Sequence, residues 1–232
     1  MGSIAFFDVD KTILGVNSAA LWVRRQLREG NISRLQGLRV SFWVGLYHLG
    51  YVDLESLIDE AVATLRGKSE RDVIDQTLRF YREEVEQTVK PQALTAIAAH
   101  KARGDLIFLL TSSSNYMSAP LSDTLKVDGF LANRFEANDG IFTGRAVRPL
   151  CFGAGKVAHA ETVAAKVGVA LSECSFYTDS MSDLPMLEVV GEPVAVDPDP
   201  RLRRLAVRRG WRIENWQAPP PPTPPALPPH QG

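Results

Sequence analysis

The chain has 232 residues, of which 45% are hydrophobic and 23% are charged, and its formal net charge is -1. This length accommodates one sizeable domain or a core with a smaller companion, and the composition is that of an ordinary soluble protein. A charge so close to zero excludes a general attraction to nucleic acid or to anionic membranes, and no apolar stretch is long enough to span a bilayer. Cys151 and Cys174 are too few for a disulfide framework, which favours a reducing, cytoplasmic location.

The first predicted element is a strand that runs directly into two carboxylates. Residues 4–7 are all apolar, and Asp8 and Asp10 follow them with one valine between. A short run that is apolar on both faces predicts a strand buried in a parallel sheet. Ligands of open α/β sheets bind beyond the carboxyl ends of the strands, where these two aspartates would emerge. Neighbouring carboxylates repel each other unless a cation lies between them or one is protonated, and oxygen ligands with room for water suit Mg²⁺.

Helical patterns follow the first strand, and we interpret residues 16–89 as a small all-helical domain inserted into the chain. The apolar residues of 35–50 cover more than one helix face, which predicts a helix buried in this bundle. A dimer contact or a helix lying on a membrane surface is the alternative for that segment. The expected helices run from Asn17 or Ser18 to Gly30, over 35–50, from Asp53 to Gly67, and from Ser69 towards Val89.

From Pro91 onwards the pattern alternates between helix and strand, which is typical of a parallel sheet in an α/β fold. The sequence Asn138-Asp139-Gly140 predicts the turn of a hairpin over 134–146. The expected strands are 106–110, 175–178 and 194–196, and the expected helices are 91–102, 116–126, 153–167, 181–190 and 200–210.

Two features near the carboxyl end suggest other functions. Six arginines lie within 201–212, but Leu202 and Leu205 keep a core-facing stripe, which favours a solvated helix face over a nucleic-acid surface. Eight of the eleven residues in 219–229 are proline, which predicts that 217–232 is a disordered, extended polyproline II tail outside the core. Docking of this tail on a partner is the alternative.

The predicted strand and helix ends carry the groups that phosphoryl transfer requires. Its transition state spreads negative charge over three oxygens, so catalysis consists mainly of positioning and electrostatic stabilisation. The Thr111 hydroxyl and the Ser112 N–H could donate to phosphate oxygens, and Lys156 would offset negative charge. Mg²⁺ held by Asp8 and Asp179 would clamp a phosphoryl oxygen.

The same pattern assigns covalent and proton-transfer roles to the first two carboxylates. Asp8 fits a nucleophile that forms an aspartyl-phosphate, and Asp10 fits the acid that protonates the leaving oxygen and later activates water. Each further residue also has a structural explanation: Thr111 as a helix cap, Lys156 as a surface lysine, and Asp183 as a helix-start carboxylate. Their shared position at predicted strand ends favours the catalytic interpretation.

These residues resemble the four motifs of the haloacid dehalogenase (HAD) superfamily, and the helical insertion resembles the C1 cap of its phosphoserine-phosphatase-like branch, subfamily IB. The resemblance implies a Rossmann-like core of residues 1–15 and 90–216, a C1 cap of 16–89, Mg²⁺ dependence and phosphomonoester hydrolysis. It also implies that the backbone carbonyl of Asp10 binds the metal and that Asp183 supports the metal shell. The motifs are Phe7-Asp8-Val9-Asp10-Lys11-Thr12, Leu109-Leu110-Thr111, Lys156, and Asp179-Ser180-Met181-Ser182-Asp183.

The candidate substrate contacts differ from those of phosphoserine phosphatases. Asn17 stands where those enzymes carry a glutamate that reads the substrate amino group, and Ser112-Ser113 replace two glycines. We therefore expect a small phosphomonoester substrate, either phosphoserine or a related amino-alcohol phosphate such as histidinol phosphate. The alternatives are a phosphotransferase or mutase on the same core, and a non-catalytic binding protein that uses the proline-rich tail. None of these features indicates an oligomeric state.

Overall fold

The computed structural model describes residues 2–31 and 54–216. Within them the core is a six-stranded sheet whose neighbouring strands are all parallel, in the order β3-β2-β1-β6-β7-β8. The α/β fold predicted from the alternating pattern is therefore confirmed, with a Rossmann-like core. The strands are β1 (Ile4–Phe7), β2 (Leu106–Ser114), β3 (Gly129–Asn133), β6 (Ser175–Thr178), β7 (Glu192–Val196) and β8 (Arg212–Glu214).

Helices cover both faces of this sheet. On β1, Ala5 and Phe7 belong to one buried cluster, while Ile4 and Phe6 belong to another, because successive side chains of a strand point to opposite faces. Apolar residues of α5 and α6 complete the first cluster, and those of α7, α8 and α9 complete the second. These helices are α5 (Pro91–Arg103), α6 (Asn115–Leu125), α7 (Ala154–Val167), α8 (Leu184–Leu187) and α9 (Pro200–Arg209).

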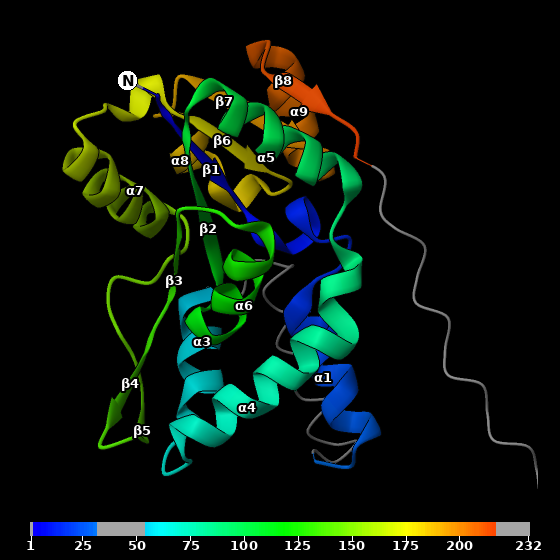
Figure 1. The fold of residues 1–232 in the computed structure, drawn as a ribbon, viewed down its shortest axis with the longest axis vertical. Helices are drawn as coiled ribbons and strands as arrows, with labels where there is room; N and C mark the ends of the chain where they lie inside the picture. The colour runs from blue at the N-terminus through cyan, green and yellow to red at the C-terminus, as the bar shows by residue number, and fades with distance from the viewer. Residues whose placement is uncertain (1, 32–53, 217–232) are drawn as a thin grey trace, which may run out of the picture.

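Within the described residues, three further helices lie between β1 and α5 in the sequence. Figure 1 shows them in the lower half of the molecule, beyond the end of the sheet at which β1 and β2 terminate. The segments that connect them to the core run antiparallel: Leu14 is bridged to Val89, and the Lys90 N–H donates to the Ile13 carbonyl at 2.8 Å. These helices are α1 (Ser18–Arg28), α3 (Leu54–Ala63) and α4 (Glu70–Phe80), and the short turns η2 (Tyr81–Val85) and η3 (Glu86–Thr88) follow α4.

The predicted limits of these helices are largely observed. Asn17 caps α1, and Ser69 caps α4 by accepting a hydrogen bond from the Asp72 N–H. Helix α3 ends at Ala63, four residues before the predicted stop at Gly67, and a turn fills the interval. The helix expected over 35–50 and the tail of 217–232 lie outside the described residues, and the division into a core and a cap stays a prediction.

A β-hairpin extends from the core towards these helices. Strands β4 (Phe135–Asn138) and β5 (Ile141–Ala146) flank the predicted turn, where Asp139 and Gly140 have φ of 50° and 76°. This left-handed pair is the conformation that a two-residue hairpin turn requires. The Gly67 N–H donates to the Phe142 carbonyl at 2.9 Å, so the hairpin is hydrogen-bonded to the chain between α3 and α4.

Some elements differ from the predictions. Strand β2 continues to Ser114 instead of ending at Leu110, and strands β3 and β8 were not predicted. The helix expected over 181–190 consists of two short turns, η5 (Met181–Asp183) and α8, because Pro185 has no N–H with which to continue a helical ladder.

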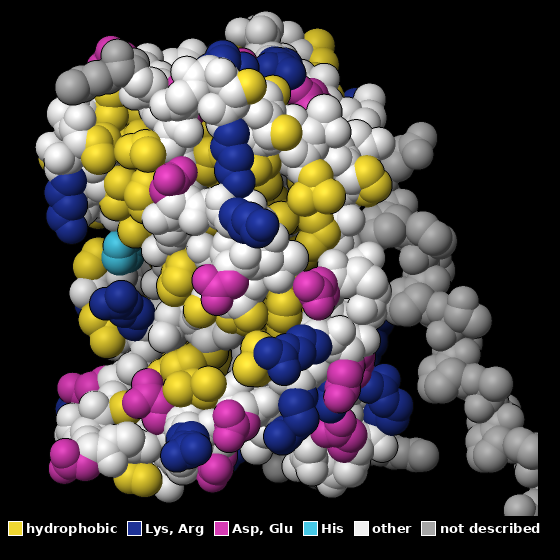
Figure 2. Space-filling view, viewed as in Figure 1, with side chains coloured by type: hydrophobic (Ala, Val, Ile, Leu, Met, Phe, Trp, Pro, Cys, Tyr) yellow, Lys and Arg dark blue, Asp and Glu magenta, His cyan; other side chains and the backbone are white. Residues whose placement is uncertain are grey.

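The surface agrees with the near-neutral composition. On the face shown in Figure 2, acidic and basic side chains are interspersed over the lower helices. Among the described residues, no helix is both long and apolar enough to cross a membrane.

Candidate active site

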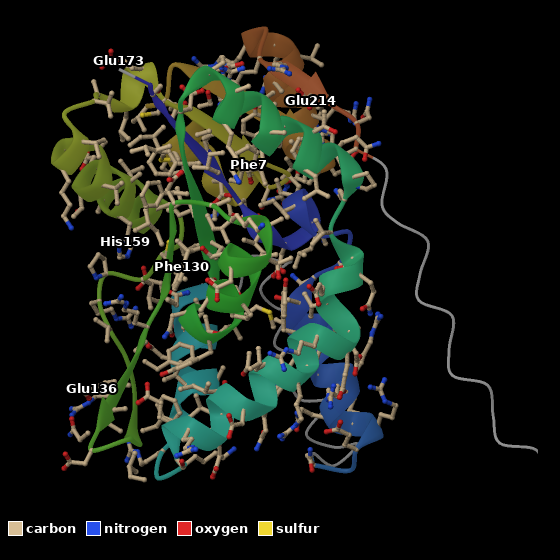
Figure 3. All side chains as sticks on the ribbon, in the orientation of Figure 1. Phe7, Phe130, Glu136, His159, Glu173 and Glu214 are labelled. Carbon is tan, nitrogen blue, oxygen red and sulfur yellow. The ribbon has the colours of Figure 1, made fainter. Side chains whose placement is uncertain are left out.

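A buried lysine joins two of the predicted carboxylates at the carboxyl end of the sheet. Lys156 Nζ lies 2.8 Å from Asp8 Oδ1 and 2.8 Å from Asp183 Oδ2. The three residues are only 2%, 7% and 2% exposed, and the Thr178 hydroxyl donates a further hydrogen bond to Asp183 Oδ2 at 2.7 Å. Charges this deeply buried are stable only when paired, so these groups hold one another in place. Phe7, labelled in Figure 3, is the last residue of β1 and directly precedes Asp8.

The start of α7 places Lys156 there. The residue before it, Gly155, packs against Leu150 so closely that a Cβ would lie 1.9 Å from the Leu150 carbonyl oxygen. Only glycine permits this approach of two backbone segments. Burial acts to lower the pKa of Lys156, but the carboxylates of Asp183 and Asp8 outweigh it and raise the pKa above its ordinary value. The ammonium group therefore stays charged.

The side chain of Thr12 connects Asp8 with the loop that carries Asp179. Its hydroxyl donates to Asp8 Oδ2 at 3.5 Å and accepts a hydrogen bond from the Asp179 N–H at 3.0 Å. Thr12 is fully buried, so this hydroxyl satisfies groups that water does not reach. Thr12 belongs to the first motif, in which no role is predicted for it. Its only signal was a hydroxyl in the polar turn that follows the aspartates.

The carboxylates of the site are buried close to one another, which raises their pKa values. Burial raises the pKa of Asp8 to about 8, an effect that Lys156 opposes and that Asp183 and Asp179 reinforce. Burial also raises the pKa of Asp179 to about 7, partly opposed by Lys11. Carboxylates that repel each other in a buried site favour a bound cation.

The donor set of this site fits Mg²⁺. No group of three or more His, Cys, Asp or Glu side chains is arranged to hold a metal within the described ranges. Mg²⁺ does not require such a group, because it binds through one or two carboxylates and keeps several waters. Asp8 and Asp179, whose pKa values burial raises, and the backbone carbonyl of Asp10 would supply that set.

Asp10 lies in the turn η1 (Val9–Ile13), and its side chain is held at the beginning of α1. Its Oδ1 accepts a hydrogen bond from the Ser18 N–H at 2.9 Å. An unpaired N–H at a helix start is a favourable partner for a carboxylate. Burial nevertheless raises the pKa of Asp10. The turn itself is closed by the Leu14 N–H, which donates to the Val9 carbonyl at 2.9 Å.

The predicted phosphate-binding residues lie on the continuation of β2. Thr111 is 1% exposed, and its Oγ1 accepts a hydrogen bond from the Ser113 N–H at 3.1 Å. Within the described part of the chain this hydroxyl donates to no protein group, so its hydrogen is available to a ligand. The Ser112 carbonyl accepts from Asn133 Nδ2 at 2.7 Å, which anchors this stretch to β3.

Asn17 occupies a different position from the buried cluster. Its Oδ1 accepts a hydrogen bond from the Ala20 N–H at 2.9 Å and so caps α1, and the residue is exposed. The structure therefore brings together Asp8, Asp179, Asp183 and Lys156, and it places Asp10 and Thr111 on the segments beside them. A contact between Asn17 and a substrate stays a prediction.

Comparison with known proteins places the chain among hydrolases. The family described as haloacid dehalogenase-like hydrolase matches residues 5–188. The chain is 30% identical over 217 residues to a phosphoserine phosphatase of Mycobacterium tuberculosis, covering 92% of this chain and 70% of that protein. It is 25% identical over 223 residues to a histidinol-phosphatase of Neisseria meningitidis serogroup C, covering 94% and 100%. A crystal structure of a protein of unknown function from Bordetella pertussis Tohama I matches with a TM-score of 0.84 and 30% identity, covering 92% and 99%.

Proposed function

The chain belongs to the haloacid dehalogenase-like hydrolases and is a phosphatase of that family, and we propose that it hydrolyses a small phosphomonoester with Asp8 as nucleophile. The observation that supports this most strongly is the buried contact of Lys156 with Asp8 and Asp183, at 2.8 Å each. It provides a carboxylate at the end of a central strand together with a fixed positive charge. Such a pair is suited to an approaching phosphate dianion.

In the first step the Asp8 carboxylate attacks phosphorus, a P–O bond to Asp8 forms, and the ester P–O bond breaks. The Lys156 ammonium reduces the repulsion between Asp8 and the phosphate. The Thr111 hydroxyl and the Ser112 N–H donate to the equatorial oxygens, whose charge they help to stabilise. The product of this step is an alcohol and an aspartyl-phosphate.

Asp10 carries the proton in both steps. It donates a proton to the departing ester oxygen and then removes one from the water that hydrolyses the aspartyl-phosphate. Burial raises its pKa, which favours the protonated form that the first step needs. Its hydrogen bond with the Ser18 N–H holds the carboxyl group in one orientation.

Mg²⁺ would be held by Asp8, Asp179 and the backbone carbonyl of Asp10, and when bound it supplies positive charge against the transferring phosphoryl group. Asp183 acts indirectly. Its Oδ2 accepts a hydrogen bond from Lys156 Nζ at 2.8 Å and another from the Thr178 hydroxyl at 2.7 Å. It therefore fixes the ammonium group beside the metal ligands.

For the substrate we propose an amino-alcohol phosphate, such as phosphoserine or histidinol phosphate, which is in keeping with the names of the two curated relatives. Asn17, Ser112 and Ser113 are the candidate contacts to it. Residues 16–89 would act as a cap that closes over the substrate and excludes water during the first step. We expect the protein to work in the cytoplasm, a location with which two free cysteines agree.

The decisive variant is Asp8→Asn, which removes the nucleophile and leaves Lys156 paired with Asp183. We expect it to abolish hydrolysis of p-nitrophenyl phosphate in the presence of Mg²⁺ while circular dichroism stays that of the wild type. Asp75→Asn, at an exposed carboxylate of α4, is the control and should keep full activity. Retained turnover in Asp8→Asn would remove Asp8 from this role.

A panel of phosphorylated metabolites, assayed with Mg²⁺ and again with a chelator, would then identify the substrate. Product analysis with and without an added alcohol distinguishes hydrolysis from phosphoryl transfer to a second substrate.

A further inference from the structure

Lys90 is a second buried lysine, located where the inserted helices return to the core. It directly precedes Pro91, the first residue of α5, and it is 3% exposed. A lysine is rarely buried to this degree, and its ammonium group then needs acceptors in place of water. Its role therefore depends on what those acceptors are.

The ammonium group of Lys90 binds two segments that are far apart in the sequence. Its Nζ donates to the backbone carbonyl of Lys11 at 2.5 Å and to Asp197 Oδ2 at 2.8 Å. Lys11 and Asp197 have φ of 58° and 43°, and they are two of the four non-glycine residues with positive φ in the described ranges. This left-handed conformation is unfavourable for side-chain-bearing residues and persists only where surrounding contacts impose it. Lys90 contacts both.

The first of these segments is the turn that carries the proposed acid and base. Lys11 directly follows Asp10, whose carbonyl group is also a proposed metal ligand. The conformation of Lys11 therefore affects the orientation of the peptide unit that contains the Asp10 carbonyl. Lys90 fixes it by a hydrogen bond to the next carbonyl along the chain.

The second segment supports the loop with the other metal-binding carboxylate. Asp197 lies two residues before Asp199, whose N–H donates to the Asp179 carbonyl at 2.8 Å. Asp199 Oδ2 also accepts a hydrogen bond from the Met181 N–H at 2.6 Å. Asp197 is thus connected, through Asp199, to the backbone on both sides of Ser180.

We propose that Lys90 is a positioning residue that fixes the Asp10–Lys11 turn relative to the Asp179 loop, and so sets the geometry in which Asp10 acts and the metal ligands converge. This inference rests on the proposed function. A purely structural lysine would support folding alone, without a specific effect on turnover or on Mg²⁺ binding.

Lys101 provides a control for the backbone contacts, at a position where the side chain is exposed and not buried as in Lys90. Its Nζ donates to the carbonyls of Leu125 and Lys126 at 3.1 Å and 2.6 Å, and Lys126 also has a positive φ, of 51°. This arrangement resembles that of Lys90 but lies at the end of α6, away from the site residues. Lys90→Met and Lys101→Met each remove an ammonium group that binds a left-handed backbone segment, and only the first should affect the site.

For Lys90→Met we expect kcat for p-nitrophenyl phosphate to fall roughly 10- to 100-fold with little change in KM, the usual effect of losing a group that orients metal ligands. The Mg²⁺ concentration that half-saturates the rise in unfolding temperature should increase by a similar factor. Hydrogen–deuterium exchange should become faster for the amides of residues 9–16. Lys101→Met should leave all three measurements at their wild-type values.

Unchanged kcat and Mg²⁺ response in folded Lys90→Met would overturn the proposal. If Lys90→Met does not fold, Asp197→Asn provides the test. This variant removes the charge of the partially exposed carboxylate that Lys90 contacts, and asparagine tolerates a positive φ. We expect Asp197→Asn to change kcat, the Mg²⁺ response and the exchange rates in the same direction as Lys90→Met, but by smaller factors. Wild-type values in Asp197→Asn would overturn the proposal. Should the wild type hydrolyse no phosphomonoester, the proposed function fails, while the exchange comparison still tests whether Lys90 holds the turn.

Discussion

Replacing Lys156 with methionine tests the electrostatic organisation of the site. The side chain has a similar length, but Asp8 and Asp183 lose the ammonium group that lies 2.8 Å from each. Removing one partner of a buried ion pair typically costs about 3–5 kcal/mol of the free energy of unfolding. Native domains have only about 5–15 kcal/mol in total, so Lys156→Met should be markedly less stable.

The loss of stability in Lys156→Met should depend on pH. The direction of this dependence follows from the number of protons that the folded state binds. Burial already raises the pKa of Asp8 from 3.8 to about 8, and Lys156 opposes that rise, so its removal raises the pKa further. Both folded proteins therefore keep a proton on Asp8 that the unfolded chain releases in the ordinary carboxyl range, but above about pH 8 only the variant still keeps it, so its stability there falls further than that of the wild type. Each pH unit over which the variant alone retains this proton adds roughly 1.4 kcal/mol to the destabilisation.

The assay is urea unfolding of the wild type and Lys156→Met at about pH 6.5 and about pH 9, without divalent ions. The destabilisation should be smaller at the lower pH. Lys101→Met serves as the control, because the ammonium group of Lys101 binds only backbone carbonyls in the described residues. Any destabilisation by Lys101→Met should therefore not vary with pH in this range. A destabilisation by Lys156→Met that is equal at both pH values would refute the argument that ionised carboxylates cause it.

Two further predictions concern turnover and metal binding. Asp10→Asn should lower kcat by roughly 10²- to 10⁴-fold. The decrease should be larger for an alkyl phosphate than for p-nitrophenyl phosphate, because the leaving group of the latter needs no proton. An equal decrease in kcat with both substrates would argue against an acid role for Asp10. Without metal, the stability of the wild type should fall as pH rises from the ordinary carboxyl value of 3.8 towards the raised pKa values of Asp8 and Asp179, about 8 and about 7. Mg²⁺ should therefore increase the unfolding temperature more at about pH 8 than at about pH 5.5, as measured by differential scanning fluorimetry with and without a chelator, and an equal increase at both would contradict this.

Much of the fold could be predicted from local patterns. Ser69 caps α4, which was expected to begin there, and the glycines that follow α5 and α9, Gly104 and Gly210, have φ of 79° and 66°. Caps and stops depend on hydrogen bonds within a few residues and on the conformational freedom of glycine, so the sequence contains the relevant information. The buried strand β1 was recognisable for a similar reason, because a strand covered on both faces is apolar throughout.

Elements that depend on their neighbours were not predictable in this way. Strand β8 has only three residues and is defined by its pairing with β7. Strand β2 extends to Ser114, where it pairs with Asn133 of β3 after a shift in register. Short strands have little periodicity of their own, and the hydrogen bonds that define them join distant parts of the chain.

The residue types of the site, from Asp8 to Asp183, and their positions near predicted strand ends follow from local sequence patterns. The pairing of these groups depends on the folded chain: Lys156 contacts Asp8 across 148 residues of sequence, Thr12 joins Asp8 to the Asp179 loop, and Lys90 links Lys11 with Asp197. Burial and pairing of charges depend on the packing of separate segments around a common point, and that packing has no signature in the local order of residues.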